Sequence, residues 1–107
     1  METILSCFTV REIYYSPIEG VTFHCDCKEQ DNYYEGATMT HNVPPEHVRS
    51  WSIITKNEES TRGYIGLKGI TSPLNVPLYN DIDRKNFSDI MTTIRSRSDL
   101  SFSFKYV

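Results

Sequence analysis

The apolar residues near the end of the chain change their spacing, which predicts a helix followed by a strand. The first group recurs at intervals of three and four residues, the spacing of one helix face: Phe87, Ile90, Met91 and Ile94. Asp83 is a candidate N-cap for this helix, and Ile82 is positioned to contact Phe87 as a hydrophobic staple. Arg95 and Arg97 follow near the helix end, where cations suit the exposed carbonyl groups.

After residues 96–99 the apolar positions alternate with polar ones, the pattern of a strand with one apolar face. The apolar members of this alternation are Leu100, Phe102, Phe104 and Tyr106. A helix and a strand that each present an apolar face need a sheet beside them to bury it.

A β-hairpin is predicted in the first part of the chain. Residues 4–15 are rich in β-branched and aromatic side chains, and residues 21–28 alternate cleanly between apolar and polar positions. Pro17 and Gly20 between these two segments are typical of turns. The alternation in residues 4–15 is imperfect, which indicates a β-bulge or burial on both faces.

Three further strands are predicted in the middle of the chain: residues 33–41, 51–56 and 64–70. Pro44 and Pro45 end the first of them, because proline cannot donate a backbone hydrogen bond. Residues 46–50 form either one helical turn or the start of the next strand. The polar residues 57–63 predict an exposed hairpin loop, and the two prolines within 71–81 predict an extended loop before the helix.

These elements predict a single α+β domain over residues 1–107. Its mostly antiparallel sheet would have about five to six strands. The C-terminal amphipathic helix would pack on one face of that sheet, and one final strand would follow it. An all-β sandwich with a peripheral helix is the alternative. An immunoglobulin-type sandwich is disfavoured, because no second cysteine follows Trp51.

The composition narrows the class of protein. The chain has 107 residues, with 38% hydrophobic and 12% aromatic residues, which suits a globular domain. No apolar run is long enough for a membrane span, and the first residues lack the pattern of a signal peptide. Three cysteines, an odd number, favour reduced thiols, so we expect a cytoplasmic protein.

The charge is distributed unevenly along the chain. Residues 1–61 carry four basic and ten acidic residues, a net charge of −6, and residues 62–107 carry seven basic and four acidic residues, a net charge of +3. Such an asymmetry produces opposed acidic and basic surfaces only if folding keeps the two parts of the chain apart.

The segment His24-Cys25-Asp26-Cys27 contains residue types that bind zinc. On a strand Cys25 and Cys27 would point the same way, but they also continue an apolar face, where a free thiol behaves as a small hydrophobic group. His24 and Asp26 would lie on the opposite, polar face. Core packing of the two cysteines is the preferred interpretation, and no metal or cofactor is expected. A small hydrolase or metal-binding domain around residues 24–27 is the second alternative function.

A nucleic-acid-binding module is the first alternative function. Basic residues occur on the predicted helix and final strand: Arg84, Lys85, Arg95, Arg97 and Lys105. The sequence pI near 5.5 opposes a strong affinity for phosphate groups.

Protein binding is the preferred function, because the sequence contains no catalytic motif and is rich in tyrosine. The candidate binding residues are two tyrosine pairs and three charged residues near the predicted loop: Tyr14, Tyr15, Tyr33, Tyr34, Glu58, Glu59 and Arg62. Alternation on a strand would expose at least one tyrosine of each pair. We therefore expect a non-enzymatic accessory protein or small inhibitor, of the kind common among phage and other viral proteins. A sheet edge is a second candidate interface, for a partner or for another copy of the chain.

Overall fold

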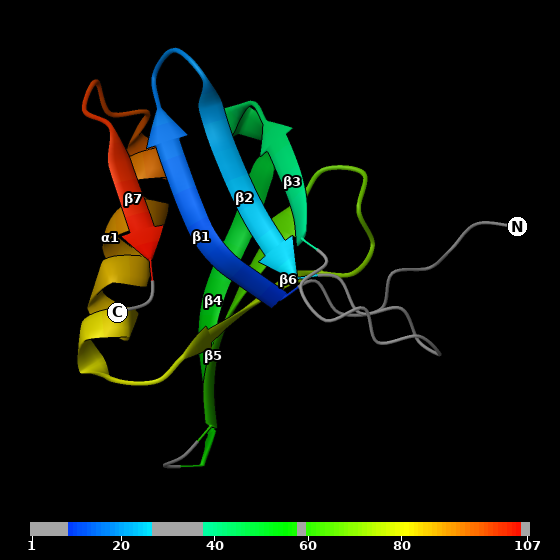
Figure 1. The fold of residues 1–107 in the computed structure, drawn as a ribbon, viewed down its shortest axis with the longest axis vertical. Helices are drawn as coiled ribbons and strands as arrows, with labels where there is room; N and C mark the ends of the chain where they lie inside the picture. The colour runs from blue at the N-terminus through cyan, green and yellow to red at the C-terminus, as the bar shows by residue number, and fades with distance from the viewer. Residues whose placement is uncertain (1–8, 27–37, 58–59, 106–107) are drawn as a thin grey trace, which may run out of the picture.

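The structure is a computed structural model, in which residues 9–26, 38–57 and 60–105 are described. They form seven β-strands, one α-helix and one 3-10 helix (Figure 1). In chain order these are β1 (Thr9–Ser16), β2 (Gly20–Asp26), β3 (Thr38–Val43), η1 (Pro45–His47), β4 (Val48–Asn57), β5 (Ser60–Leu67), β6 (Leu74–Leu78), α1 (Asp81–Ser96) and β7 (Phe102–Lys105). This arrangement confirms the predicted α+β fold, with a mostly antiparallel sheet and one helix near the C-terminal end.

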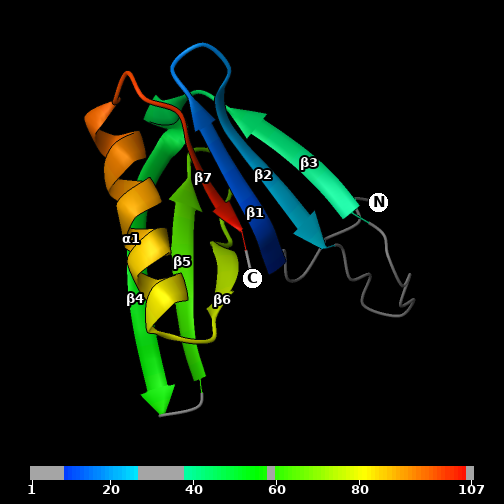
Figure 2. The ribbon, with the colours of Figure 1, turned by 60° about the vertical axis from the view of Figure 1, so that its left-hand side comes forward.

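The strands form one sheet in the order β3-β2-β1-β6-β5-β4. The pair β1–β6 is parallel and joins only Thr9 and Asn75, whereas the other pairs are antiparallel. Further along β1, its residues from Glu12 to Tyr15 pair with β7 instead. Figure 2 shows β1 beside both β2 and β7. Strand β1 therefore connects the β4–β5–β6 part of the sheet to the part formed by β1, β2, β3 and β7.

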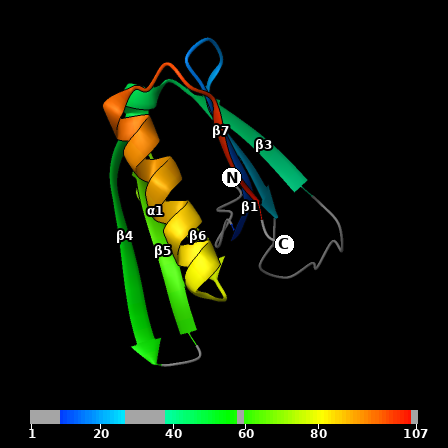
Figure 3. The ribbon, with the colours of Figure 1, turned by 90° about the vertical axis from the view of Figure 1, so that its left-hand side faces the viewer.

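Helix α1 packs against both parts of the sheet. It contacts β4, β6, β1 and β7, and Figure 3 shows it between the β4–β5–β6 part and the β1–β7 part. The four residues predicted to share one helix face are all buried: Phe87, Ile90, Met91 and Ile94. Burial of this apolar face is the main interaction that holds the helix on the sheet.

The predicted hairpin is confirmed by the antiparallel pairing of β1 with β2. The pairing register shifts between Val10 and Glu12, so the imperfect alternation does correspond to a bulge. Val21, Phe23 and Cys25 are buried on one face of β2, as their alternation predicted.

The helix begins earlier than predicted. Asn80, not Asp83, is the N-cap, and its Oδ1 accepts a hydrogen bond of 2.8 Å from the Asp83 backbone N–H. Asp83 is the third helical residue, and its Oδ2 accepts a hydrogen bond of 3.1 Å from the Tyr79 N–H. Ile82 is 63% exposed, so the predicted staple is wrong. It precedes Phe87 by five residues, a spacing that does not place two side chains on one helix face.

Two predicted loops are partly strands. Residues 74–78, predicted as part of a loop, form β6. The strand tolerates Pro77, because among the described residues β6 pairs with β1 only at Asn75 and no ladder with β1 needs the N–H that proline lacks. The hairpin loop predicted over 57–63 is shorter, since β4 continues to Asn57 and β5 starts at Ser60. The polar residue Thr61 is buried on β5, so the prediction from polar composition placed the start of β5 too late in the chain.

Other strand boundaries also differ. Strand β5 ends at Leu67 rather than at residue 70, because Gly69 adopts a φ of 80° in the turn that follows. For residues 46–50 the predictions of a helical turn and of a strand start are both partly correct, since η1 is followed directly by β4.

The final strand is shorter than its alternation predicted. Leu100 is 73% exposed and precedes β7, whose pairing with β1 starts at Phe102. Phe104 is buried, whereas Phe102 at the strand start is partly exposed. Tyr106 lies outside the described residues. Neither helix in the described ranges has the length and apolar character needed to span a membrane.

Candidate functional site

Tyr14 lies on the outer face of the sheet, opposite the face that packs on α1. Its neighbours along β1, Ile13 and Tyr15, point into the core, so alternation directs Tyr14 and Glu12 outward. In the sheet Tyr14 pairs with Thr22 of β2 and with Ser103 of β7. Both partners are small, and Tyr14 is 37% exposed.

A row of polar side chains crosses four strands beside Tyr14. Glu12 pairs with Lys105 on one side and with His24 on the other, and His24 in turn pairs with Thr40. We call Glu12, Tyr14, His24, Thr40 and Lys105 the Tyr14 surface. Four separate strands supply it, so it exists only in the folded chain.

Hydrogen bonds and a ring contact hold this surface in one arrangement. The Tyr14 hydroxyl donates to Glu12 Oε2 at 2.9 Å, and Lys105 Nζ lies 3.2 Å from Glu12 Oε1. The rings of Tyr14 and His24 meet edge to face, with centroids 5.4 Å apart and planes at 84°. His24 Nδ1 lies 3.1 Å from Thr40 Oγ1. These contacts favour one orientation of the tyrosine ring, although the residue is partly exposed.

The same contacts change the acid–base properties of three groups. The hydroxyl of Tyr14, and then the ammonium of Lys105, stabilise the Glu12 carboxylate and lower its pKa. In return, the Glu12 carboxylate raises the pKa of Tyr14 and that of Lys105. At neutral pH the surface therefore presents a paired carboxylate and ammonium beside a neutral phenol.

The structure separates the candidate protein-binding residues. Tyr15 is only 2% exposed and its hydroxyl donates to the Ser98 carbonyl at 2.6 Å, which removes it from the candidate surface. Arg62 lies on β5, where its Nη1 donates to Asn75 Oδ1 at 3.0 Å. The remaining four candidates lie outside the described residues: Tyr33, Tyr34, Glu58 and Glu59.

The candidate nucleic-acid residues are also divided. Arg84 forms an ion pair with Asp81, Lys85 lies 3.3 Å from Asp89, and Lys105 pairs with Glu12. Arg95 and Arg97 remain exposed at the C-terminal end of α1. Acidic neighbours thus accompany three of the five cations, which reduces the positive potential available to a phosphate backbone.

The segment of residues 24–27, which contains residue types that bind zinc, is divided between the core and the surface. Cys25 is buried in the core opposite Val10, as expected of a small hydrophobic group, and Cys27 lies outside the described residues. Within the described ranges no three His, Cys, Asp or Glu side chains are grouped closely enough to hold a metal ion. Asp26 lies 3.5 Å from Arg11, and His24 contacts Tyr14 and Thr40 instead of Asp26.

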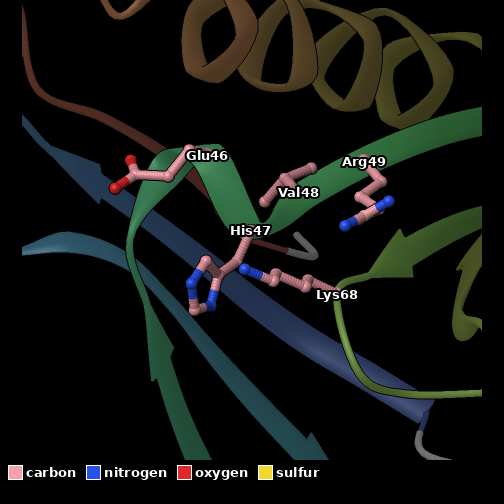
Figure 4. A pocket seen from close by; sticks show the side chains of 5 residues that line it. All are labelled: Glu46, His47, Val48, Arg49 and Lys68. Atoms are coloured by element: carbon pink, nitrogen blue, oxygen red, sulfur yellow. The ribbon is translucent and has the colours of Figure 1, made fainter.

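A second feature, which the sequence did not suggest, lies at the start of β4. Figure 4 shows a shallow recess lined by Glu46, His47, Val48, Arg49 and Lys68, in which the Glu46 carboxylate is directed away from the two cations. The Lys68 backbone N–H donates to the His47 carbonyl at 2.8 Å, which joins the turn after β5 to η1. Lys68 is far from His47 and Arg49 in the sequence, so no local pattern could have grouped all three.

Folding also mixes the two parts of the chain that differ in charge. The Lys105–Glu12 pair links the basic C-terminal part to the acidic N-terminal part across β7 and β1.

Comparison with known protein families, with curated proteins and with solved structures finds no match for this chain.

Proposed function

We propose that this protein is a non-enzymatic accessory or inhibitor protein that binds another protein through the Tyr14 surface. The main support is that Tyr14 is partly exposed while its hydroxyl is hydrogen-bonded to Glu12 and its ring contacts His24. Exposed aromatic side chains that are already held in place lose little conformational freedom on binding, so they are effective interface anchors.

The surroundings of Tyr14 favour a protein partner. The Glu12–Lys105 pair, Thr22 and Ser103 lie beside Tyr14 in the sheet, and Thr40 lies beyond His24 on the same face. A central aromatic residue with a polar rim is typical of transient protein interfaces. The rim can exchange hydrogen bonds with a partner while the ring enters a pocket on it.

The proposal is tested by comparing two exposed tyrosines that lie on different elements. Tyr79, between β6 and α1, is even more exposed than Tyr14 and serves as the matched control. Wild type, Tyr14→Ala and Tyr79→Ala are used as bait in a nuclease-treated lysate of the source cells. We expect one protein to be recovered with wild type and Tyr79→Ala, and about tenfold less of it with Tyr14→Ala.

Melting temperatures of the variants establish that Tyr14→Ala remains folded. Equal recovery of the partner with all three baits would place the interface elsewhere. Capture that disappears after nuclease treatment would instead favour the nucleic-acid alternative.

A further inference from the structure

Strand β4 forms one edge of the sheet in the described part of the chain. It stands at one end of the strand order and pairs with β5 alone among the described residues. Figure 3 shows α1 over the face of this part of the sheet, with β4 as its outermost strand. Seven of the ten β4 residues are exposed and none is buried. The backbone groups on this edge can therefore pair with an added strand.

The central part of this edge is regular and uncharged. Pairing with β5 is uninterrupted over residues 50–55, and register shifts lie on either side of them. Trp51, Ile53 and Ile54 within this segment favour strand conformation. Arg49 precedes the segment and Lys56 follows it. A strand of about six residues can therefore pair with this uninterrupted part of β4.

Two recesses adjoin this edge. The basic recess lies at the start of β4 and is lined by two cations, Arg49 and Lys68, together with Glu46, His47 and Val48 (Figure 4). The apolar recess lies on the outer face and is lined by Ser50, Ser52, Ile54, Tyr64, Gly66 and Pro73. Gly66 keeps the second recess open, because a β-carbon there would come within 2.5 Å of Ser50 Oγ and fill part of the space.

We propose that β4 binds an extended peptide segment of a partner protein as an added strand. A carboxylate of that segment would occupy the basic recess, and an apolar side chain would occupy the apolar recess. Neither Arg49 nor Lys68 forms an ion pair within the described part of the chain, so both cations can meet an incoming carboxylate. This surface is separate from the Tyr14 surface, and the inference does not depend on the proposed function.

A second copy of the chain fits this edge less well. Antiparallel pairing of two β4 strands about the centre of residues 50–55 would place Arg49 opposite Lys56 of the other copy. Like charges directly opposite each other destabilise a strand pair. An acidic strand removes this repulsion, which is why a partner segment is favoured over self-association.

The probe is a short fluorescent peptide of alternating threonine and valine, amidated, with two glutamates at its C-terminal end. Matched peptides carry two lysines in place of the glutamates, a free C-terminal carboxylate without glutamates, or N-methyl groups on alternate residues. Binding to the full chain is measured by fluorescence anisotropy. The first and third peptides distinguish a side-chain carboxylate from a terminal one, and the fourth blocks strand pairing.

We expect the glutamate peptide or the free-carboxylate peptide to bind about tenfold more tightly than the lysine peptide. The double variant Arg49→Glu/Lys68→Glu should reverse this preference, whereas the control Arg95→Glu/Arg97→Glu should leave it unchanged. N-methylation should abolish binding. Ile54→Glu, which places a charge in the apolar recess, should weaken binding of the acidic peptide about tenfold.

The inference is overturned if no acidic peptide binds, or if the acidic and lysine peptides bind equally well to wild type. It is also overturned if charge reversal at Arg49 and Lys68 leaves the preference unchanged, or if the N-methylated peptide binds as well as its parent. Concentration-dependent dimerisation that Ile54→Glu abolishes would assign the edge to a second copy instead.

Discussion

The ring of Phe87 on α1 lies against the backbone of Gly63 on β5. A β-carbon added at Gly63 would lie only 2.6 Å from Phe87 Cζ, so the helix can approach this strand only where a side chain is missing. Phe87 is fully buried and also meets the rings of Trp51 and Phe104 edge to face. Gly63 therefore determines how closely the helix sits on the sheet.

Gly63→Ala is expected to lower the free energy of unfolding by about 1–3 kcal/mol, because the methyl group would overlap the Phe87 ring. Chemical denaturation measures this change. In a Phe87→Leu background the same substitution should cost less, since the smaller side chain leaves room for the methyl group. Equal costs in the two backgrounds would contradict the contact.

Tyr15→Phe is expected to reduce stability by about 1 kcal/mol, because the Ser98 carbonyl loses its hydrogen-bond donor. Tyr14→Phe, one residue away, should change the unfolding free energy by less than about 0.5 kcal/mol, as its hydroxyl is exposed. Urea denaturation of both variants makes the comparison. A larger loss for Tyr14→Phe would contradict the assignment of Tyr15 to the core and Tyr14 to the surface.

Replacing Asn80 with Ala is expected to cost about 1 kcal/mol, because the Asp83 N–H loses its acceptor at the start of α1. Asp81→Ala is the matched control, since its carboxylate is almost fully exposed and pairs with Arg84 in the next turn. Thermal denaturation should show a clear decrease for the first variant and little change for the second. Comparable decreases would indicate that general helix charge, rather than the cap, is responsible.

The pH dependence of the Tyr14 surface has a defined sign. The pKa of Glu12 in the folded protein is lower than its ordinary value of 4.5, so the carboxylate contributes stability above pH 4.5. This contribution is lost as the pH falls through the lowered folded pKa. Glu12→Gln should therefore flatten the stability profile in this acidic range, which denaturation at a series of pH values would show.

The same variant should change the titration of the neighbouring groups in the alkaline range. The folded pKa values of Tyr14 and Lys105 lie above their ordinary values of 10.0 and 10.5. Their contribution is present below these ordinary values and is lost as the pH rises through the raised folded values. Glu12→Gln should return both pKa values toward ordinary, as measured by NMR titration. Unchanged values would contradict the Glu12 contacts.

Much of the fold could be predicted because short-range periodicity reports which side chains are buried. The helix face from Phe87 to Ile94 and the alternation in β2 both correspond to buried residues. Prediction failed where composition was used in place of periodicity. Thr61 and Pro77 indicated loops, yet both belong to strands, because β5 and β6 bury alternate residues against α1 and the rest of the core.

The candidate sites could be predicted only in part. Alternation required one tyrosine of the pair 14–15 to be exposed, but whether that was Tyr14 depended on the bulge between Val10 and Glu12. Nothing local in the sequence linked Glu12 to Lys105, or His47 to Lys68. Those pairs depend on which strands become neighbours.

The sequence alone determined the elements that bury an apolar face, because their spacing of two or of three to four residues is a local property. It also favoured the α+β class over an all-β sandwich, since a helix and strands with apolar faces must cover one another. The tertiary structure alone decided the strand order, the edge position of β4 among the described strands and the cross-strand row at Tyr14. These depend on contacts between distant segments, which form only when the whole chain has folded around its core.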